Sequence, residues 1–185
     1  LTEFSVRNII RRSKVELICT TDDPADDLSA HIELAKEKDL GFKVLPSFRP
    51  DKAIHVEKKD FPEYVEKLAK TSQVVIDGVE ALKEALSKRL DFFNRQGCKV
   101  SDHALDSYIY SECTCEEAEE IFRKAMARQP IDELEAEKFQ TYMLLFFAAK
   151  YAEYGWGMQL HYNCLRNNNS VMFEKLGPDT GFDCI

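Results

Sequence analysis

Short apolar runs, each followed by charged or amide side chains, recur four times along the chain. They begin at Val15, Phe42, Cys98 and Trp156 and give way to polar residues within a few positions. Continuous apolar runs without alternation are typical of strands that are buried in a parallel sheet. The pattern therefore predicts four buried parallel strands, with polar tips at residues 22–24, 49–51, 102–106 and 161–169.

Segments with helical spacing separate these runs. Leu28, Ile32 and Ala35 recur at helical intervals after Pro24, a residue suited to the first turn of a helix, and Asp23 is a candidate cap for that helix. Further helices are predicted over residues 61–69, over residues 79–96 with Gly97 as the stop, from a Thr114/Glu117 capping box, and from Pro130 to Gly155.

The alternation of strands and helices predicts an α/β fold. No glycine-rich phosphate loop follows a strand, which favours a barrel over a nucleotide-binding open sheet. A complete (β/α)8 barrel has eight strands and roughly 250 residues. We therefore expect residues 1–185 to form a single segment, a partial TIM-type barrel with about four parallel strands and extra helices. The carboxyl ends of its strands would bring the polar tips to one shared site.

Composition narrows the class of partner and the compartment. The net charge of −8 argues against a nucleic-acid partner. The longest apolar run, residues 142–149, is shorter than the ~20 residues that cross a bilayer, so we expect no membrane partner and interpret the run as a buried helix face. No secretory leader is visible at Leu1. The six cysteines are expected to be reduced and the protein cytoplasmic, and Cys113 and Cys115 lack the further ligands of a zinc site.

Two strand tips carry candidate chemical groups. Arg49 precedes Pro50, which holds its backbone extended, and a guanidinium there could clamp a carboxylate or form an ion pair with Asp51. Asp102 could act as a general base, a hydroxyl acceptor or a metal ligand, or it could cap a turn.

The fourth strand supplies the remaining candidates. His161 is either a functional imidazole or a satisfied core histidine. The run from Arg166 through Asn167 and Asn168 to Asn169 could bind sugar hydroxyls or form a turn. His31 and His55 show no pattern of partners.

Several motifs together resemble the uronate (glucuronate) isomerase family. They are Thr20-Thr-Asp-Asp-Pro24, Leu45-Pro-Ser-Phe-Arg-Pro-Asp-Lys-Ala53, Gly97-Cys-Lys-Val-Ser-Asp-His-Ala-Leu-Asp106, Leu165-Arg-Asn-Asn-Asn169 and Leu176-Gly-Pro-Asp-Thr-Gly-Phe-Asp183. The resemblance extends over almost the whole chain.

This resemblance implies a distorted TIM barrel of the amidohydrolase superfamily and a divalent metal, zinc by preference. It implies interconversion of D-glucuronate with D-fructuronate and of D-galacturonate with D-tagaturonate, through proton movement between C2 and C1. Asp102 and His161 would orient hydroxyls or assist proton transfer. The residues that would bind substrate are Arg49, Arg166, Asn167 and Asn168.

The chain departs from the family pattern by omission. It contains no His-x-His and lacks the Asp-x-Arg segment expected after the last strand. We therefore expect no metal ligands within this segment, a central portion of a longer chain that is inactive when isolated. A half barrel is expected to pair with a second copy as a homo-oligomer. The alternatives are a metal-dependent hydrolase and a noncatalytic half barrel that binds sugar acids.

Overall fold

The computed structural model describes residues 2–105, 109–178 and 180–182 of the chain. Asp106, Asp179, Asp183 and Cys184, which belong to the sequence motifs and the cysteine set, lie outside these residues. The described elements are, in chain order, the 3-10 helix η1 (Thr2–Phe4), α1 (Val6–Arg12), β1 (Leu17–Cys19), α2 (Ser29–Leu34), β2 (Lys43–Leu45), α3 (Asp51–Ile54), α4 (Phe61–Ser72), α5 (Val79–Arg95), β3 (Val100–Ala104), α6 (Cys115–Met126), α7 (Glu133–Tyr154), β4 (Gly157–His161) and α8 (Ser170–Leu176).

The four strands are parallel, as predicted. Strand β1 pairs with β2, and β3 pairs with β4. Phe48 joins the two pairs, because it forms parallel bridges to Asp22 on one side and to Ser101 on the other. The strands therefore follow one another across the fold in their order along the chain, with helices in the connections, as in a barrel wall.

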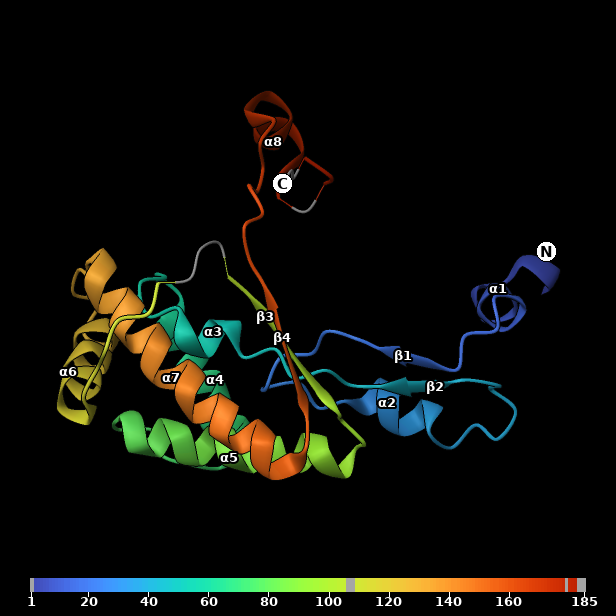
Figure 1. Cartoon of the computed structure of the whole chain (residues 1–185), viewed down its shortest axis with the longest axis horizontal. Helices are drawn as coiled ribbons and strands as arrows, with labels where there is room; N and C mark the ends of the chain where they lie inside the picture. The colour runs from blue at the N-terminus through green and yellow to red at the C-terminus, as the bar shows by residue number, and fades with distance from the viewer. Residues whose placement is uncertain (1, 106–108, 179, 183–185) are drawn as a thin grey trace.

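Helices α4 to α7 form the body of the molecule beside β3 and β4, whereas β1, β2 and α1 extend away from it and α8 stands apart after β4 (Figure 1). The core lies between these helices and the sheet. Phe48 is fully buried there, with ring centroids 5.0 Å from Phe93 and 6.0 Å from Phe147. The residue that joins the two strand pairs thus also anchors the helices to the sheet.

The helices with an apolar stripe were predicted correctly. In α5, Leu82, Leu86, Leu90 and Phe93 are all fully buried, and the chain leaves the helix through Gly97, at a positive φ of 89° that favours glycine.

Capping signals set the ends of the next two helices. The expected Thr114/Glu117 capping box starts α6. Helix α7 begins at Glu133 rather than Pro130, because Asp132 and Glu135 form a second capping box. It ends at Tyr154, and Gly155, whose φ is 66°, forms its C-terminal cap.

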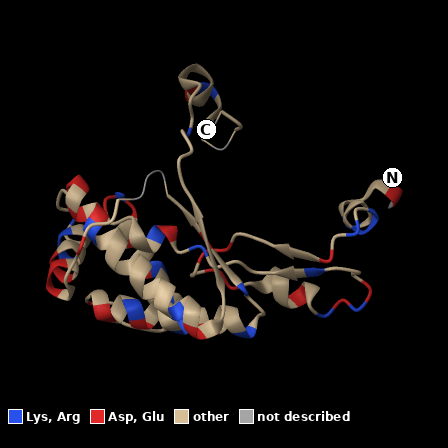
Figure 2. Ribbon diagram, viewed as in Figure 1, with Lys and Arg blue, Asp and Glu red and all other residues tan. Residues whose placement is uncertain are grey.

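The apolar run within α7 is buried only in part. Met143, Leu144 and Phe147 are buried, but 55% of Leu145 is exposed. Acidic and basic residues are interspersed along α5, α6 and α7 (Figure 2). None of the described helices is long and apolar enough to cross a membrane.

Two predictions about the first helical segment were wrong. Helix α2 begins at Ser29, not at Pro24, and ends at Leu34. The Asp23 carboxylate accepts the Ala25 N–H at 2.8 Å, so it closes a turn instead of capping a helix. Leu28 then enters α2 with a φ of 54°.

The prediction of buried strands was also wrong for the outer two. Leu17 on β1 is 46% exposed and Leu160 on β4 is 41% exposed. Among the described residues, each outer strand pairs on one side only.

Three short helices, α1, α3 and α8, were not predicted, because each is four to seven residues long and has too few positions to show a helical period.

Candidate functional site

Strand β3 places Asp102 at the centre of the site. Successive side chains of a strand face opposite sides of the sheet, so Asp102 and its neighbours Ser101 and His103 face different ways. The Asp102 side chain is 10% exposed and contacts a cation, an imidazole and a hydroxyl. These contacts do not support the alternative role of a turn cap, because all three are with side chains of other segments.

Arg49 is the cation of this cluster. Its Nη2 donates to Asp102 Oδ1 at 3.3 Å, and its Nε lies 3.2 Å from Asp102 Oδ2. The same Nε lies 3.4 Å from Asp51 Oδ2, so the neighbouring ion pair considered from the sequence also exists. Arg49 therefore lies between two carboxylates while 31% of its side chain remains exposed.

His161 comes from the adjacent strand. It stands opposite Ala104 in the β3–β4 register, and Ala104 lies two positions after Asp102 on β3. The Nε2 atom of His161 forms an ion-pair contact with Asp102 Oδ1. Its side chain is 52% exposed. The alternative of a core histidine is therefore wrong, since the ring is half exposed and contacts Asp102, the carboxylate predicted to lie at the same site.

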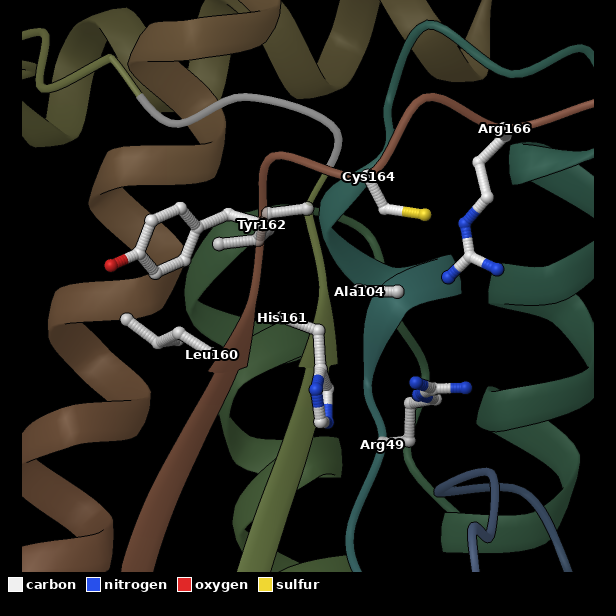
Figure 3. Close-up of a pocket in the computed structure, with 8 residues that line it drawn as sticks. Arg49, Ala104, Leu160, His161, Tyr162, Cys164 and Arg166 are labelled. Carbon is white, nitrogen blue, oxygen red and sulfur yellow. The ribbon is translucent and has the colours of Figure 1, made fainter. Parts of the chain in front are cut away.

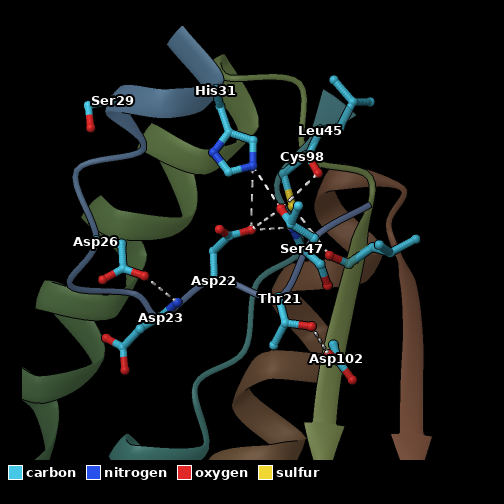
Figure 4. A network of polar contacts seen from close by, with 12 residues as sticks. Thr21, Asp22, Asp23, Asp26, Ser29, His31, Leu45, Ser47, Cys98 and Asp102 are labelled. Carbon is cyan, nitrogen blue, oxygen red and sulfur yellow. Dashed lines mark hydrogen bonds and ion pairs between the residues drawn. The ribbon is translucent and has the colours of Figure 1, made fainter. Parts of the chain in front are cut away.

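Sequence reasoning missed Thr21, and it named Asp51 only as an ion-pair partner of Arg49. Thr21 Oγ1 donates to Asp102 Oδ2 at 3.0 Å (Figure 4), and Asp51 accepts the backbone N–H of Ala104 at 3.2 Å. Thr21 directly precedes the strand-tip residue Asp22, but only its contact with Asp102 on another strand identifies it as part of the cluster.

Asp22 and His31 belong to a separate network. Asp22 Oδ2 accepts the Thr20 hydroxyl at 2.6 Å and the Ser47 N–H at 3.2 Å, and His31 Nε2 lies 3.7 Å from it (Figure 4). This network ties α2 to the first two strands. The sequence showed no pattern of partners for His31 and His55, but both have partners in the structure, since His55 Nδ1 also contacts Glu57, at 3.2 Å.

A pocket of about 480 Å³ opens beside the cluster. Its wall is formed by Arg49, Ala104, Leu105, Leu160, His161, Tyr162, Cys164 and Arg166. The guanidinium groups of Arg49 and Arg166 extend toward one another, and the His161 ring lies beside Arg49 (Figure 3). Two guanidinium groups and an imidazole around one space suit a small anion with hydroxyls, because arginine binds carboxylates through two parallel hydrogen bonds.

The asparagines of the fourth tip are placed differently. Asn167 and Asn168 are not part of the pocket wall. Asn167 has a φ of 53°, and the Asn169 side chain accepts the Met172 N–H at 3.1 Å as the cap of α8. The turn interpretation therefore holds for Asn169, while Arg166 alone of this run reaches the pocket.

The described residues do not fit a resident divalent metal. They contain no group of three or more His, Cys, Asp or Glu side chains that could hold one. Asp102 and His161 form a pair of ligand types, but the Arg49 guanidinium lies against the same carboxylate and would repel a cation.

A family model described as glucuronate isomerase matches residues 1–185. The chain belongs to the glucuronate isomerase family. Two similar proteins are uronate isomerases of Lachnoclostridium phytofermentans, 49% identical over 183 residues, and Caldanaerobacter subterraneus subsp. tengcongensis, 46% identical over 183 residues. Each alignment covers 99% of this chain and 39% of the relative.

Solved structures agree with this family assignment. The uronate isomerase of Thermotoga maritima matches with a TM-score of 0.91 and 32% identity, over 100% of this chain and 41% of that one. The glucuronate isomerase of Caulobacter crescentus matches with a TM-score of 0.87 and 27% identity, over 100% and 38%. The chain thus spans about 40% of the length of such relatives. The expectation of a partial TIM-type barrel is confirmed.

Proposed function

We propose that this chain supplies part of the sugar-acid site of a uronate isomerase that interconverts D-glucuronate with D-fructuronate and D-galacturonate with D-tagaturonate. The observation that carries the proposal is the cluster of Arg49, Asp102 and His161 beside a pocket that Arg166 also lines. Residues 1–185 are proposed to be one central segment of that enzyme. The resemblance implies a divalent metal, zinc by preference, and residues outside the segment would hold it.

The geometry supports a proposed task for each side chain that reaches the pocket or the cluster. Arg49 and Arg166 would bind the carboxylate or a hydroxyl of an open-chain uronate, because both guanidinium groups reach the pocket. Asn167 and Asn168, which lie outside the pocket wall, stay predictions as hydroxyl ligands. Asp102 would hold His161 in one tautomer through Nε2, and the paired groups would orient a substrate hydroxyl and relay its proton.

The reaction itself is a rearrangement. A proton leaves C2 and arrives at C1 through an enediol, so no water is consumed and the carboxylate at the far end serves as an anchor. A metal-dependent hydrolase would instead add water across a bond. Proton NMR of the products therefore separates the two activities.

The test follows D-glucuronate in heavy water with the full-length protein that carries this segment. Wild type is expected to form fructuronate with deuterium at the exchanged carbon. Arg49→Met and Asp102→Asn are each expected to lower kcat/KM by about 100-fold, since each removes a group that positions substrate. The matched controls, Arg12→Met and Asp39→Asn, lie on exposed parts of the chain and should retain activity.

Two results would contradict the proposal. If the full-length wild type leaves uronates unchanged, or hydrolyses a bond, the isomerase assignment fails. If the wild type is active but both site variants match their controls, the site assignment fails. The isolated 185-residue chain is expected to bind D-glucuronate weakly and to convert none of it, because the chain covers only about 40% of the length of its relatives.

The remaining predictions about the whole protein rest on sequence. The described cysteines 19, 98, 113, 115 and 164 are unpaired, and the cytoplasmic location stays a prediction from composition.

A further inference from the structure

Asp51 is the second carboxylate that touches Arg49. It is the first residue of α3, and both of its oxygens lie within 3.3 Å of the Ala104 backbone nitrogen at the end of β3. Its Oδ2 lies 3.4 Å from Arg49 Nε, and 20% of its side chain is exposed. One carboxylate thus joins the end of β3, the start of α3 and the guanidinium.

The arrangement restricts an otherwise flexible side chain. Arginine loses up to roughly 2 kcal/mol of rotamer freedom when it is held in one geometry, so a substrate-binding arginine gains from being oriented beforehand. Asp102 alone would draw the guanidinium toward β3, since it contacts both Nε and Nη2. Asp51 pulls on Nε from the α3 side and opposes that movement.

We propose that Asp51 is a positioning residue that holds the Arg49 guanidinium between two carboxylates so that it meets the carboxylate of a sugar acid. This inference rests on the proposed function, in which Arg49 binds substrate. The negative charge of Asp51 carries the effect, because an amide at the same place would still accept the Ala104 N–H but would not attract a guanidinium.

The charge state of Asp51 gives this role a pH signature. Burial raises the pKa of Asp51, while the Ala104 N–H and the charges of Arg49 and His55 act in the opposite direction and Asp102 adds to the rise. The carboxyl group therefore takes up a proton at a higher pH than an ordinary aspartate. Below that pH the guanidinium loses one of its two partners, so substrate binding should weaken on the acid side of the profile.

The test compares Asp51→Asn with wild type in the full-length protein, and uses Asp60→Asn as the matched control. Asp60 precedes α4 without a capping hydrogen bond, so its charge should matter little. Asp51→Asn is expected to raise KM for D-glucuronate by about fivefold, to change kcat less than about twofold, and to lose the acid-side decline in kcat/KM. An unchanged KM and pH profile in an active protein would overturn the proposal.

A second readout does not require activity. Phenylglyoxal modifies guanidinium groups, and mass spectrometry reports the modification of Arg49 relative to exposed Arg12 in the same sample. In Asp51→Asn the relative rate at Arg49 is expected to rise about threefold, because the guanidinium is less confined and more accessible to the reagent. An unchanged rate would overturn the proposal even if the wild type failed to isomerise uronates, which separates this failure from that of the proposed function.

Discussion

Asp102 and His103 are neighbours on β3 that lie in opposite environments. Asp102 faces the polar cluster, whereas His103 is fully buried against the rings of Phe147 and Tyr151, at centroid distances of 6.1 and 5.7 Å. Neither ring nitrogen of His103 has a hydrogen-bond partner among the described residues. Burial lowers the pKa of His103 to about 4, although Asp102 acts against the shift. The imidazole is therefore held neutral in the fold.

We expect this histidine to make stability fall with acidity. The unfolded chain takes up the proton near the ordinary histidine pKa of about 6.5, whereas the folded chain does so only near 4. Between these values the unfolded state binds more protons, so stability decreases as the pH falls through that window, by roughly 3 kcal/mol at most.

The measurement is urea unfolding of wild type and His103→Leu between pH 7 and 4. The variant should lose stability at pH 7 through poorer packing but should show a flatter pH dependence. His55→Gln is the control, because the pKa of His55 is shifted in the opposite direction. Burial lowers the pKa of His55, but the hydrogen bond to Glu57 and the charges of Glu57 and Asp51 outweigh burial and raise this pKa. Equal slopes for wild type and His103→Leu would contradict the expectation.

At the scale of elements, α5 supports the segment that follows β1. Arg89 is 8% exposed, and its Nε and Nη2 donate to the backbone carbonyls of Pro24 and Asp26 at 2.6 and 2.7 Å. The guanidinium also lies 4.3 Å from the centroid of the Phe92 ring. This segment has no helical hydrogen bonds of its own, so the contact with α5 takes their place and keeps Thr21 within reach of Asp102.

Arg89→Met is therefore expected to destabilise the protein by about 2 kcal/mol, since one buried and one part-buried carbonyl lose charge-assisted hydrogen bonds. Thermal unfolding of the full-length protein measures the effect. Lys88→Met is the control, because Lys88 pairs with Glu84 on the exposed face of α5 and should change stability by less than about 0.5 kcal/mol. Similar unfolding temperatures for the two variants would show that the Arg89 bonds contribute little.

The elements that the sequence predicted well are those with a long period or a chemical cap. Helix α5 has 17 residues over which its apolar stripe repeats, and α6 begins at a capping box. Helix α2 was predicted too early because Asp23 and Pro24 also suit a turn, and the choice depends on Arg89, which is distant in sequence. Local signals were therefore sufficient only where no remote contact competed with them.

At the scale of the whole molecule, the outer strands present apolar side chains to solvent. Leu17 on β1 and Leu160 on β4 are more than two fifths exposed, and each strand pairs on one side only among the described residues. An open strand edge with apolar neighbours is a template for further pairing. In isolation, the 185-residue chain is thus expected to associate with itself.

Sedimentation velocity of the isolated chain at micromolar concentration tests this expectation. Wild type should sediment as a dimer or larger species, and the double variant Leu17→Lys, Leu160→Lys should shift toward monomer because the added charges repel at the strand edges. Leu134→Lys is the control, since Leu134 is 55% exposed and lies in the first turn of α7, not on a strand. A monomeric wild type would contradict the expected homo-oligomer.

The sequence by itself determined the strand and helix alternation, the family, and the polar strand tips Arg49, Asp102, His161 and Arg166, because these depend on residue type and on spacing within one segment. Tertiary structure alone decided that Arg49 lies between Asp51 and Asp102, that Thr21 donates to Asp102, and that Asn169 caps α8 while Arg166 lines the pocket. It also decided which strands are exposed. The physical reason is distance along the chain: Thr21 and Asp102 are 81 residues apart, and only the parallel register of the strands brings their side chains within hydrogen-bond range.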